Sequence, residues 1–357
     1  MKWNFSVADI EDEASDVFDP TDDEPQPSNV FSITSYGADY PVEIIPKRIK
    51  TSDWYAPTFQ RNFVWSQNQS SRFIESLLLG LPVPGIFLFK ESDTGKHLII
   101  DGQQRTKTIQ LFLDEEDFGD RRFRLTNVAA PFIGKSFSEL EDADRRRLEE
   151  SIIHATIFQQ KSPEEDISSV YEVFERINTG GSKLSAQEIR SCVNHGPIVQ
   201  FLEELASTDA WLRVFRSRSK RLKDHELILR FFAFRAGVKN YSSPMKKFLD
   251  KYMRSVRSPS KQEQKKMKTV FEQTLEFIVS EIGDKTFRPE RAFNAAVFDC
   301  VAVQTSFLIE GVQKPKKFSS RYAALLADEE FLALTSRSTA DDERVQARFR
   351  KASKILA

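Results

Sequence analysis

Leu98-Ile99-Ile100-Asp101-Gly102-Gln103-Gln104-Arg105-Thr106-Lys107-Thr108-Ile109 is an apolar run that stops at Asp101-Gly102 and continues as a polar, helix-like pattern. The pattern predicts a strand over 97–100 and a helix from residue 103 to about Leu113. The first N–H groups of this helix, and the positive end of its dipole, lie at the turn beside Arg105 and Lys107. Such a turn suits a phosphate group.

The side chains of the turn allow two interpretations. Gly102 lets the backbone adopt conformations that other residues resist and lets a phosphate approach closely, and Arg105 can bind phosphate oxygens through its planar fork. Asp101 can hold a magnesium ion that bridges phosphates, or orient a ribose hydroxyl. In the alternative, Asp101 caps the helix and Arg105 forms a salt bridge in an ordinary strand-to-helix turn. Local chemistry alone slightly favours the ordinary turn.

Short strands interleaved with helices surround the turn, which predicts an α+β fold with a small mixed domain over 29–195. Capping boxes at Ser66 with Gln69, and at Ser185 with Glu188, mark two helix starts. After Pro197 the apolar spacing is helical almost throughout, which predicts an all-α domain over 196–357. The expected strands are 41–46, 85–90, 97–100 and 152–158, and the expected helices of the mixed domain are 67–79, 103–113, 162–177 and 185–194.

The composition is that of a soluble globular protein, with 357 residues, 40% hydrophobic and 29% charged. The two cysteines, Cys192 and Cys300, are too few for a disulfide framework, and no signal-peptide pattern opens the chain. Glycines and prolines interrupt the most apolar run, 77–89, which therefore cannot form a membrane-spanning helix. We expect a cytoplasmic protein with reduced thiols and no membrane partner.

Residues 1–28 form an acidic arm, with nine Asp or Glu residues against one base, Lys2. Because the formal net charge of the whole chain is −1, the remainder carries +7. Little apolar periodicity and several prolines predict a disordered or loosely attached arm. A solubilising tail is the simpler interpretation, and a segment that mimics nucleic acid by covering a basic surface is the alternative.

A second glycine-containing segment follows a predicted helix, Phe174-Glu175-Arg176-Ile177-Asn178-Thr179-Gly180-Gly181-Ser182-Lys183-Leu184-Ser185-Ala186-Gln187-Glu188-Ile189-Arg190. The N–H groups at two glycines after a helix can form an anion-binding nest, flanked here by Arg176 and Asn178. The spacing of a Walker A loop is absent. An ordinary glycine C-cap followed by a capped helix is the alternative, but it leaves Asn178 and Arg190 unexplained.

Three segments together resemble one known family. Phe59-Gln60-Arg61-Asn62-Phe63-Val64-Trp65 resembles its aromatic-Gln-Arg loop, Asp101 to Arg105 its Asp-Gly-Gln-Gln-Arg signature, and Asn178-Thr179-Gly180-Gly181 with Leu184-Ser185 and Glu188-Ile189-Arg190 its second signature. It is the N-terminal domain family of GmrSD-type, modification-dependent restriction endonucleases, a branch of the ParB/sulfiredoxin-like fold. The motifs cover residues 40–195, and the resemblance makes the functional interpretation of the turn the favoured one.

The resemblance implies binding and often hydrolysis of a nucleoside triphosphate (NTP), in an antiphage restriction system that couples nucleotide state to DNA recognition or cutting. The implied catalytic residues are Asp101, Gln103, Gln104 and Arg105, with Asp101 also a candidate ligand of Mg²⁺. The implied nucleotide-binding residues are Gln60, Arg61, Gly102, Arg105, Thr106, Arg176, Asn178, Gly180, Gly181 and Arg190.

The nuclease domain of those enzymes carries an HNH motif, which has no counterpart around His97, His154, His195 and His225. We therefore expect the chain to act with a separate nuclease or another defence-system subunit. Two alternatives stay open. One is a metal-dependent DNA nickase that uses Asp101 with carboxylates such as Glu75 or Glu188, and the other is a non-catalytic DNA-binding adaptor.

The segment from Arg213 to Lys268 is strongly basic, with 18 Lys or Arg residues and four acids, a local balance of +14. A basic helical surface of this density can neutralise DNA phosphates. Solvated helix faces, or a docking surface for the acidic arm or an acidic partner, are the alternatives. Because the charge and the resemblance agree, DNA is the favoured partner. The candidate DNA-binding residues are Arg213, Arg216, Arg218, Lys220, Arg221, Lys246 and Lys247.

Overall fold

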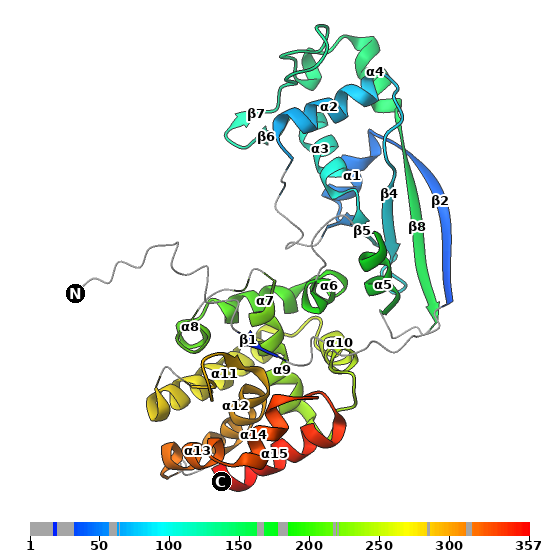
Figure 1. Cartoon of the computed structure of the whole chain (residues 1–357). Coiled ribbons are helices and arrows are strands. Elements are labelled where there is room, and N and C mark those ends of the chain that lie inside the picture. Colours follow the sequence, from blue (N-terminus) through cyan, green and yellow to red (C-terminus); the bar gives the residue numbers. More distant parts are fainter. Residues whose placement is uncertain are drawn as a thin grey trace, which may run out of the picture. The chain divides into compact units, whose positions relative to one another are not determined.

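The computed structural model describes residues 17–19, 32–56, 63, 65–162, 168–177, 185–216, 219, 221–283, 286–311 and 316–357. The chain divides into two compact units: Asn29–Leu184, called the α+β unit below, and Met1–Ser28 with Ser185–Ala357, called the helical unit. The predicted fold class is confirmed, because a mixed sheet with helices precedes a mostly helical region (Figure 1).

The domain limits expected from the sequence, 29–195 and 196–357, stay predictions. The compact units differ from them at one element. Helix α6 (Ala186–Val193) groups with the helical unit, although the sequence pattern placed it at the end of the mixed domain.

The sheet of the α+β unit has five strands in the order β2-β8-β4-β5-β3. Strand β8 is antiparallel to β2 and parallel to β4, and β5 is antiparallel to β4 and parallel to β3. The sheet strands are β2 (Ser32–Pro41), β3 (Trp54–Tyr55), β4 (Ile86–Lys90), β5 (His97–Asp101) and β8 (Ile152–Ser162). The remaining elements of this unit are α1 (Ile44–Lys50), α2 (Gln67–Leu78), α3 (Gln103–Leu113), β6 (Asp117–Phe118), β7 (Arg121–Arg122), η4 (Phe137–Glu139), α4 (Asp142–Glu150) and α5 (Ser168–Ile177).

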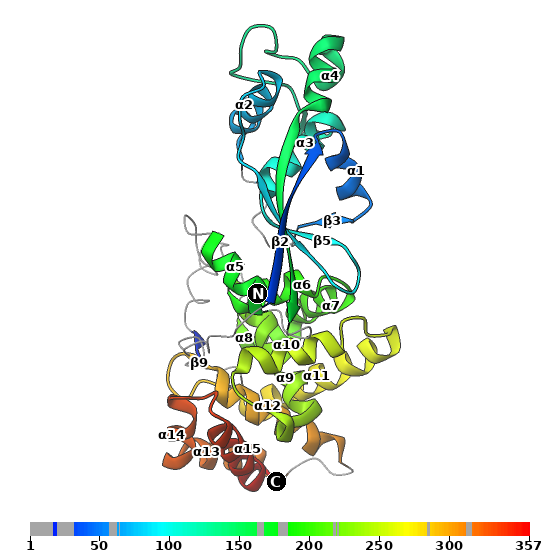
Figure 2. The same ribbon diagram turned by 90° about the vertical axis from the view of Figure 1, so that its right-hand side faces the viewer.

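One face of the sheet builds the core of the α+β unit. Residues Ile153, Ala155 and Ile157 of β8 alternate along the strand and are buried with Ile86 and Leu88 of β4. Side chains of α1, α2, α3 and α4 complete the same core, and Figure 2 shows these helices beside the sheet. This packing fixes where α3 begins relative to β4 and β5.

The predicted strand over 41–46 is wrong: Pro41 is the last residue of β2, a turn follows, and α1 begins at Ile44. Val42, in the turn before α1, and Ile45, in its first turn, are both fully buried. Pro46 lies in the first turn of α1, where its missing N–H breaks no helical hydrogen bond.

One strand is longer than expected. Strand β8 continues to Ser162 because β2 pairs with it along its whole length. The expected start of the next helix, with Ser162 as its N-cap, falls on residues 163–167, which lie outside the described part of the chain; α5 is described from Ser168 to Ile177.

The helical unit is built around an aromatic core. The ring of Trp211 lies 5.0 Å from that of Phe215 and 5.6 Å from that of Phe298, measured between centroids. In the described residues no helix is long and apolar enough to cross a membrane. The elements after α6 are α7 (Pro197–Ala206), α8 (Asp209–Phe215), α9 (Lys223–Gly237), η5 (Val238–Asn240), α10 (Met245–Ser255), α11 (Lys261–Ile282), β9 (Phe293–Asn294), α12 (Ala295–Glu310), α13 (Phe318–Leu326), α14 (Glu329–Ser336) and α15 (Asp342–Leu356).

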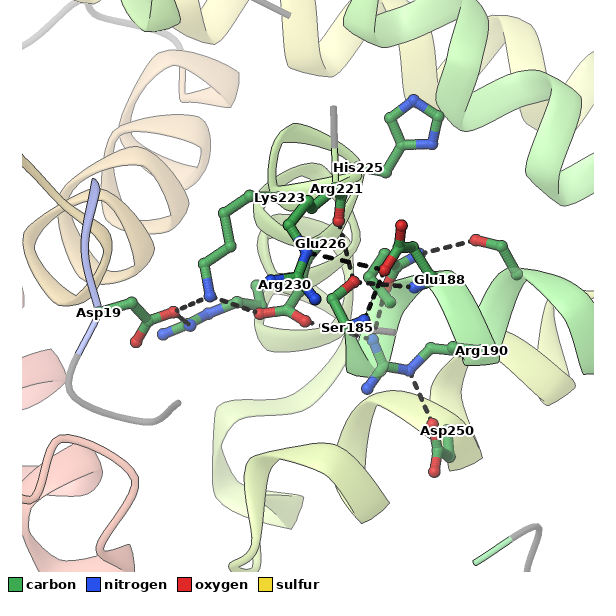
Figure 3. Close-up of polar contacts among 12 residues, drawn as sticks. Asp19, Ser185, Glu188, Arg190, Arg221, Lys223, His225, Glu226, Arg230 and Asp250 are labelled. Carbon is green, nitrogen blue, oxygen red and sulfur yellow. Dashed lines mark hydrogen bonds and ion pairs between the residues drawn. The ribbon is translucent and has the colours of Figure 1, made fainter. Parts of the chain in front are cut away.

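Part of the acidic arm is built into the helical unit. Strand β1 (Val17–Phe18) pairs in parallel with β9, and the side chain of Asp19 is only 1% exposed. Its carboxylate accepts hydrogen bonds from Nη1 of Arg230, at 2.6 Å, and lies 2.8 Å from Nζ of Lys223 (Figure 3). At residues 17–19 the structure thus differs from the expected loose arm, and residues 1–16 and 20–28 lie outside the described chain.

Asp19 joins a buried charge network that ties three helices together. Arg230 of α9 also pairs with Asp299 of α12, which lies 3.4 Å from Nη2 of Arg348 in α15. Burial alone would lower the pKa of Arg230, but Asp19 and Asp299 outweigh burial and raise that pKa. The guanidinium is therefore charged at every physiological pH.

We predict that Asp19→Asn lowers the free energy of unfolding of the helical unit by about 3–5 kcal/mol, because it leaves buried cations without their anion. The change is measured by urea unfolding at neutral pH. The matched control is Glu281→Gln, which removes the same charge at an exposed position and should change stability by less than about 0.5 kcal/mol. Equal effects of the two substitutions would contradict a structural role for Asp19.

Candidate functional site

The turn between β5 and α3 places the signature residues at one end of the sheet. Strand β5 ends at Asp101, Gly102 is the N-cap of α3 with φ +97°, and the helix begins at Gln103. Asp101 lies opposite Phe87 of β4, where the register shifts. The strand-to-helix turn predicted from the sequence is confirmed.

Glycine is required at position 102 for two reasons. Its φ lies in the left-handed region, which residues with a Cβ rarely adopt. A Cβ at this position would also stand 2.4 Å from Cγ2 and 2.9 Å from Cβ of Ile86. The turn is therefore pressed directly against β4.

Arg105 joins the turn to the beginning of β4. Its Nη2 donates to Oδ2 of Asp101 at 2.8 Å and to the carbonyl oxygen of Gly85 at 2.9 Å. The side chain of Arg105 is 15% exposed and that of Asp101 is 41% exposed. The buried Nε of Arg105 has no acceptor among the described residues. The salt bridge of the ordinary-turn interpretation is thus present, and the same guanidinium retains one unsatisfied buried donor.

Gln104 connects two of the three motifs. Its side-chain Oε1 accepts a hydrogen bond from the backbone N–H of Trp65 at 3.2 Å. The ring of Trp65 packs on Phe73, and the ring of Phe63 packs on Phe118. The end of the aromatic-Gln-Arg segment is therefore fixed beside the first turn of α3.

The other expected residues near the turn have different surroundings. Thr106 is 1% exposed, and its hydroxyl donates to the carbonyl oxygen of Gln103 at 3.0 Å. Lys107 pairs with Glu116 at 3.2 Å. Gln60 and Arg61 lie outside the described residues. The structure thus brings together Asp101, Gly102, Gln103, Gln104 and Arg105.

The second signature is described only at its two ends. Arg176, at the end of α5, is exposed and pairs with Glu172 at 3.1 Å. Residues Asn178, Gly180 and Gly181 lie outside the described chain. Arg190, in the helical unit, is fully buried.

Arg190 has carboxylate partners within its own unit (Figure 3). Its Nε donates to Oδ1 of Asp250 at 2.7 Å, and its Nη1 lies 3.6 Å from Oε2 of Glu226. Burial alone would raise the pKa of Glu226, but Lys223 and Arg190 together outweigh burial and lower it. These contacts account for Arg190 structurally, and we do not place it in the nucleotide site proposed below.

The described residues contain no group of three His, Cys, Asp or Glu side chains that could hold a metal ion. The two carboxylates considered for a nickase already accept backbone hydrogen bonds, Glu75 from Ala129 and Glu188 from Ser185. A magnesium ion at Asp101 would therefore need oxygen ligands from phosphates, which is its usual mode of binding in nucleotide sites.

The basic segment is exposed in part. Arg213, Arg216 and Arg221, near the junction of α8 and α9, and Lys247 of α10 are exposed, and Lys246 is half-buried. Lys247, Lys251 and Arg254 follow helical spacing on α10, whereas Met245, Leu249 and Met253 are buried. Arg218 and Lys220 lie outside the described residues.

Other bases of the segment have internal partners. Arg230 is buried between Asp19 and Asp299, Lys223 pairs with Asp19, and Arg235 pairs with Glu310. The local balance of +14 therefore overstates the charge that faces solvent. Sequence reasoning missed this because the acids of these pairs lie far away in the chain.

Comparison with known proteins relates most of the α+β unit, together with α6, to one family. Residues 43–193 match the family described as the GmrSD restriction endonuclease, N-terminal domain. Searches of the curated proteins and of the solved structures each found no match. This part of the chain is a GmrSD restriction endonuclease N-terminal domain, and the resemblance drawn from the three motifs is confirmed.

We predict that Gly102→Ala destabilises the α+β unit by about 2–5 kcal/mol, because it adds a clash with Ile86 to the cost of a left-handed residue. The matched control is Gly95→Ala, since Gly95 has φ +68° and a Cβ added there would meet nothing within 4 Å. The control should cost only about 1–2 kcal/mol. Equal losses in urea unfolding would show that close approach to β4 is unimportant.

Proposed function

We propose that this chain binds and hydrolyses a nucleoside triphosphate at the turn between β5 and α3, and that it acts on DNA in a restriction or antiphage defence system together with a separate nuclease subunit. Membership of residues 43–193 in a restriction-endonuclease domain family supports the system. The observation that carries the nucleotide site is the junction of Asp101, Gly102 and Arg105 at the first turn of α3.

The phosphates are placed by the backbone at this junction. The first N–H groups of a helix have no intrahelical partner and lie at the positive end of its dipole. Gly102, as N-cap, presents no side chain between them and a ligand, and α3 is long enough for a substantial dipole. An anionic phosphate is stabilised in this position.

Arg105 and Asp101 have complementary roles in the proposed reaction. The guanidinium of Arg105, held by Gly85 and Asp101, stabilises negative charge that develops on the transferred phosphoryl group. The half-exposed carboxylate of Asp101 suits a hard cation, and Mg²⁺ bound there would neutralise phosphate charge.

The two glutamines differ in role. Gln104 accepts from Trp65, so it positions the aromatic-Gln-Arg segment beside the phosphates. Gln103, the first residue of α3, is the one we assign to orienting the attacking water. Attack of this water on the γ-phosphorus breaks its bond to the bridging oxygen and releases inorganic phosphate and the diphosphate.

DNA is assigned to exposed and half-buried bases of the helical unit. Arg213, Arg216 and Arg221 lie near the junction of α8 and α9, and Lys246 and Lys247 lie in the first turn of α10. Positive side chains of this kind bind phosphates with little dependence on sequence and with strong dependence on salt.

We predict that one of the four ribonucleoside triphosphates with Mg²⁺ raises the melting temperature of the chain. At a hundredfold excess over Kd the stabilisation amounts to about 2.7 kcal/mol. Arg105→Gln should weaken binding at least tenfold, and Asp101→Asn should remove the dependence on Mg²⁺. The measurement is a thermal-shift titration accompanied by an assay of phosphate release.

The charge-matched control is Lys107→Gln, on the same helix but paired with Glu116. It should retain binding. Absence of any shift in the wild-type chain with all four nucleotides would end the nucleotide hypothesis. A shift without phosphate release would select the non-catalytic adaptor instead.

We predict that replacing Arg213, Arg216 and Lys247 together with Gln lowers the slope of log K against log salt by up to about 2.7 for duplex DNA, about 0.9 for each lost phosphate contact. Affinity is measured by fluorescence anisotropy over a range of salt concentrations. The control replaces Lys316, Arg337 and Arg350, three exposed bases of the helical unit outside the segment. An identical slope for both triple variants would contradict binding through the 213–268 segment.

A further inference from the structure

Helix α6 carries polar residues of the second signature that the proposed nucleotide site does not use. Ser185 is its N-cap, and Glu188 and Arg190 lie in its first two turns. The family match, residues 43–193, ends at the last residue of α6, although this helix groups with the helical unit. These three residues contact α9, α10 and the turn before α9, which all belong to the helical unit. Their role is therefore to be found on that unit.

Arg190 joins three helices from a buried position (Figure 3). Its side chain is 1% exposed, its Nε donates to Oδ1 of Asp250 in α10 at 2.7 Å, and its Nη1 lies 3.6 Å from Oε2 of Glu226 in α9. The carboxylate side chains of Asp250 and Glu226 are only 13% and 9% exposed, so solvent screens these charges little. A short charged hydrogen bond is also directional, unlike an apolar contact. Arg190 therefore fixes how α10 lies against α6.

Asp250 is the single acid of α10, a helix with four bases. It follows Lys247 by three residues and precedes Arg254 by four, so the three side chains share one face of the helix. An uncompensated carboxylate on this face would pair with these bases and repel the phosphates of DNA. Arg190 compensates that carboxylate, and the face keeps its positive charge.

The start of α6 contacts a second basic element. The hydroxyl of Ser185 donates to the carbonyl oxygen of Arg221 at 2.9 Å and accepts from the N–H of Glu188 at 3.1 Å. Nε of Arg221 lies 4.0 Å from Oε2 of Glu188, but an ion pair of this length contributes little when the arginine side chain is 58% exposed. The hydrogen bond from Ser185 is therefore the contact that holds the backbone at Arg221, just before α9.

We propose that α6 positions the DNA-binding surface of the helical unit, with Arg190 holding α10 and Ser185 holding the backbone at Arg221. These two basic elements lie far apart in the sequence, and one helix sets their relative placement, so that both can contact phosphates of the same duplex. Ser185 and Arg190 are thus positioning residues, which act through Arg221 and through the bases of α10. This role rests on the proposed binding of DNA and is independent of the nucleotide site.

The substitution Asp250→Asn separates positioning from charge, because the two effects have opposite signs. Removal of an acid beside basic side chains strengthens binding to DNA if only the charge matters. Loss of the contact with Arg190 weakens binding, and we expect an affinity for duplex DNA at least about threefold lower, measured by fluorescence anisotropy. The matched control is Glu276→Gln, which removes the same charge at an exposed position of α11. It should bind DNA as tightly as the wild-type chain or more tightly.

A double-mutant cycle tells positioning from a general loss of stability. Lys247→Gln should cost less affinity in the Asp250→Asn chain than in the wild-type chain, because Lys247 is then already misplaced. In the Glu276→Gln chain it should cost as much as in the wild-type chain. Unfolding of a fraction of the Asp250→Asn molecules would lower the active concentration but leave the cost of Lys247→Gln unchanged.

The substitution Ser185→Gly tests the second contact and guards against misfolding of the first variant. Glycine is nearly as good an N-cap as serine, so α6 is retained while the hydroxyl that donates to Arg221 is lost. The affinity for DNA should fall, and Arg221→Gln should then have little further effect. The matched control is Ser66→Gly, at the capping box of α2 in the α+β unit. It should leave the affinity unchanged.

The anchoring of α10 is measured without DNA, by hydrogen–deuterium exchange of the free chain. Asp250→Asn should speed the exchange of the α10 amides, and Glu276→Gln should not. If the wild-type chain binds DNA and both Asp250→Asn and Ser185→Gly bind it at least as tightly, the role of α6 is overturned and the DNA surface stands. If the wild-type chain binds no duplex DNA, the DNA surface is overturned and this role with it, even where the exchange of α10 changes.

Discussion

The contact between Gly102 and Ile86 is the constraint on which the candidate site depends. It lets the chain pass from β5 into α3 with a left-handed residue pressed against β4. Arg105 can reach both Asp101 and the carbonyl oxygen of Gly85 only from a helix that begins at this place. The positions of the sheet, the turn and the N-terminus of α3 therefore depend on one another. The chemistry proposed for the site uses the N–H groups and side chains at this turn.

Elements with local signals could be predicted from the sequence. The capping boxes at Ser66 and Ser185 mark the starts of α2 and α6, and both are formed in the structure. The segment 41–46 could not be assigned in this way, because its apolar residues fit a strand as well as the turn and helix in which Val42 and Ile45 are buried. Packing against the core of the α+β unit decides between the two conformations. Such tertiary contacts cannot be inferred from a few consecutive residues.

The sequence could not show which charged side chains pair with each other, because the partners lie far apart in the chain. Asp19 looked like one acid of a loose arm, yet its partner Arg230 lies in the middle of the helical unit. Arg190 looked like a ligand-binding residue, yet Asp250 pairs with it. By contrast, the hydrogen bond between Gln104 and Trp65 joins two motifs that the family resemblance also groups together. The motifs and their order indicated the family, whereas the local charge balance overstated the number of basic side chains that face solvent.

The central claim is that phosphates bind at the first turn of α3, and hydrogen–deuterium exchange of the intact chain tests that location most directly. With saturating triphosphate and Mg²⁺, the account predicts that the amides of Gln103, Gln104 and Arg105 exchange at least tenfold more slowly. Gly95, in the open turn between β4 and β5, should be unaffected. Bound nucleotide that leaves exchange at residues 103–105 unchanged would contradict the account and place the site elsewhere.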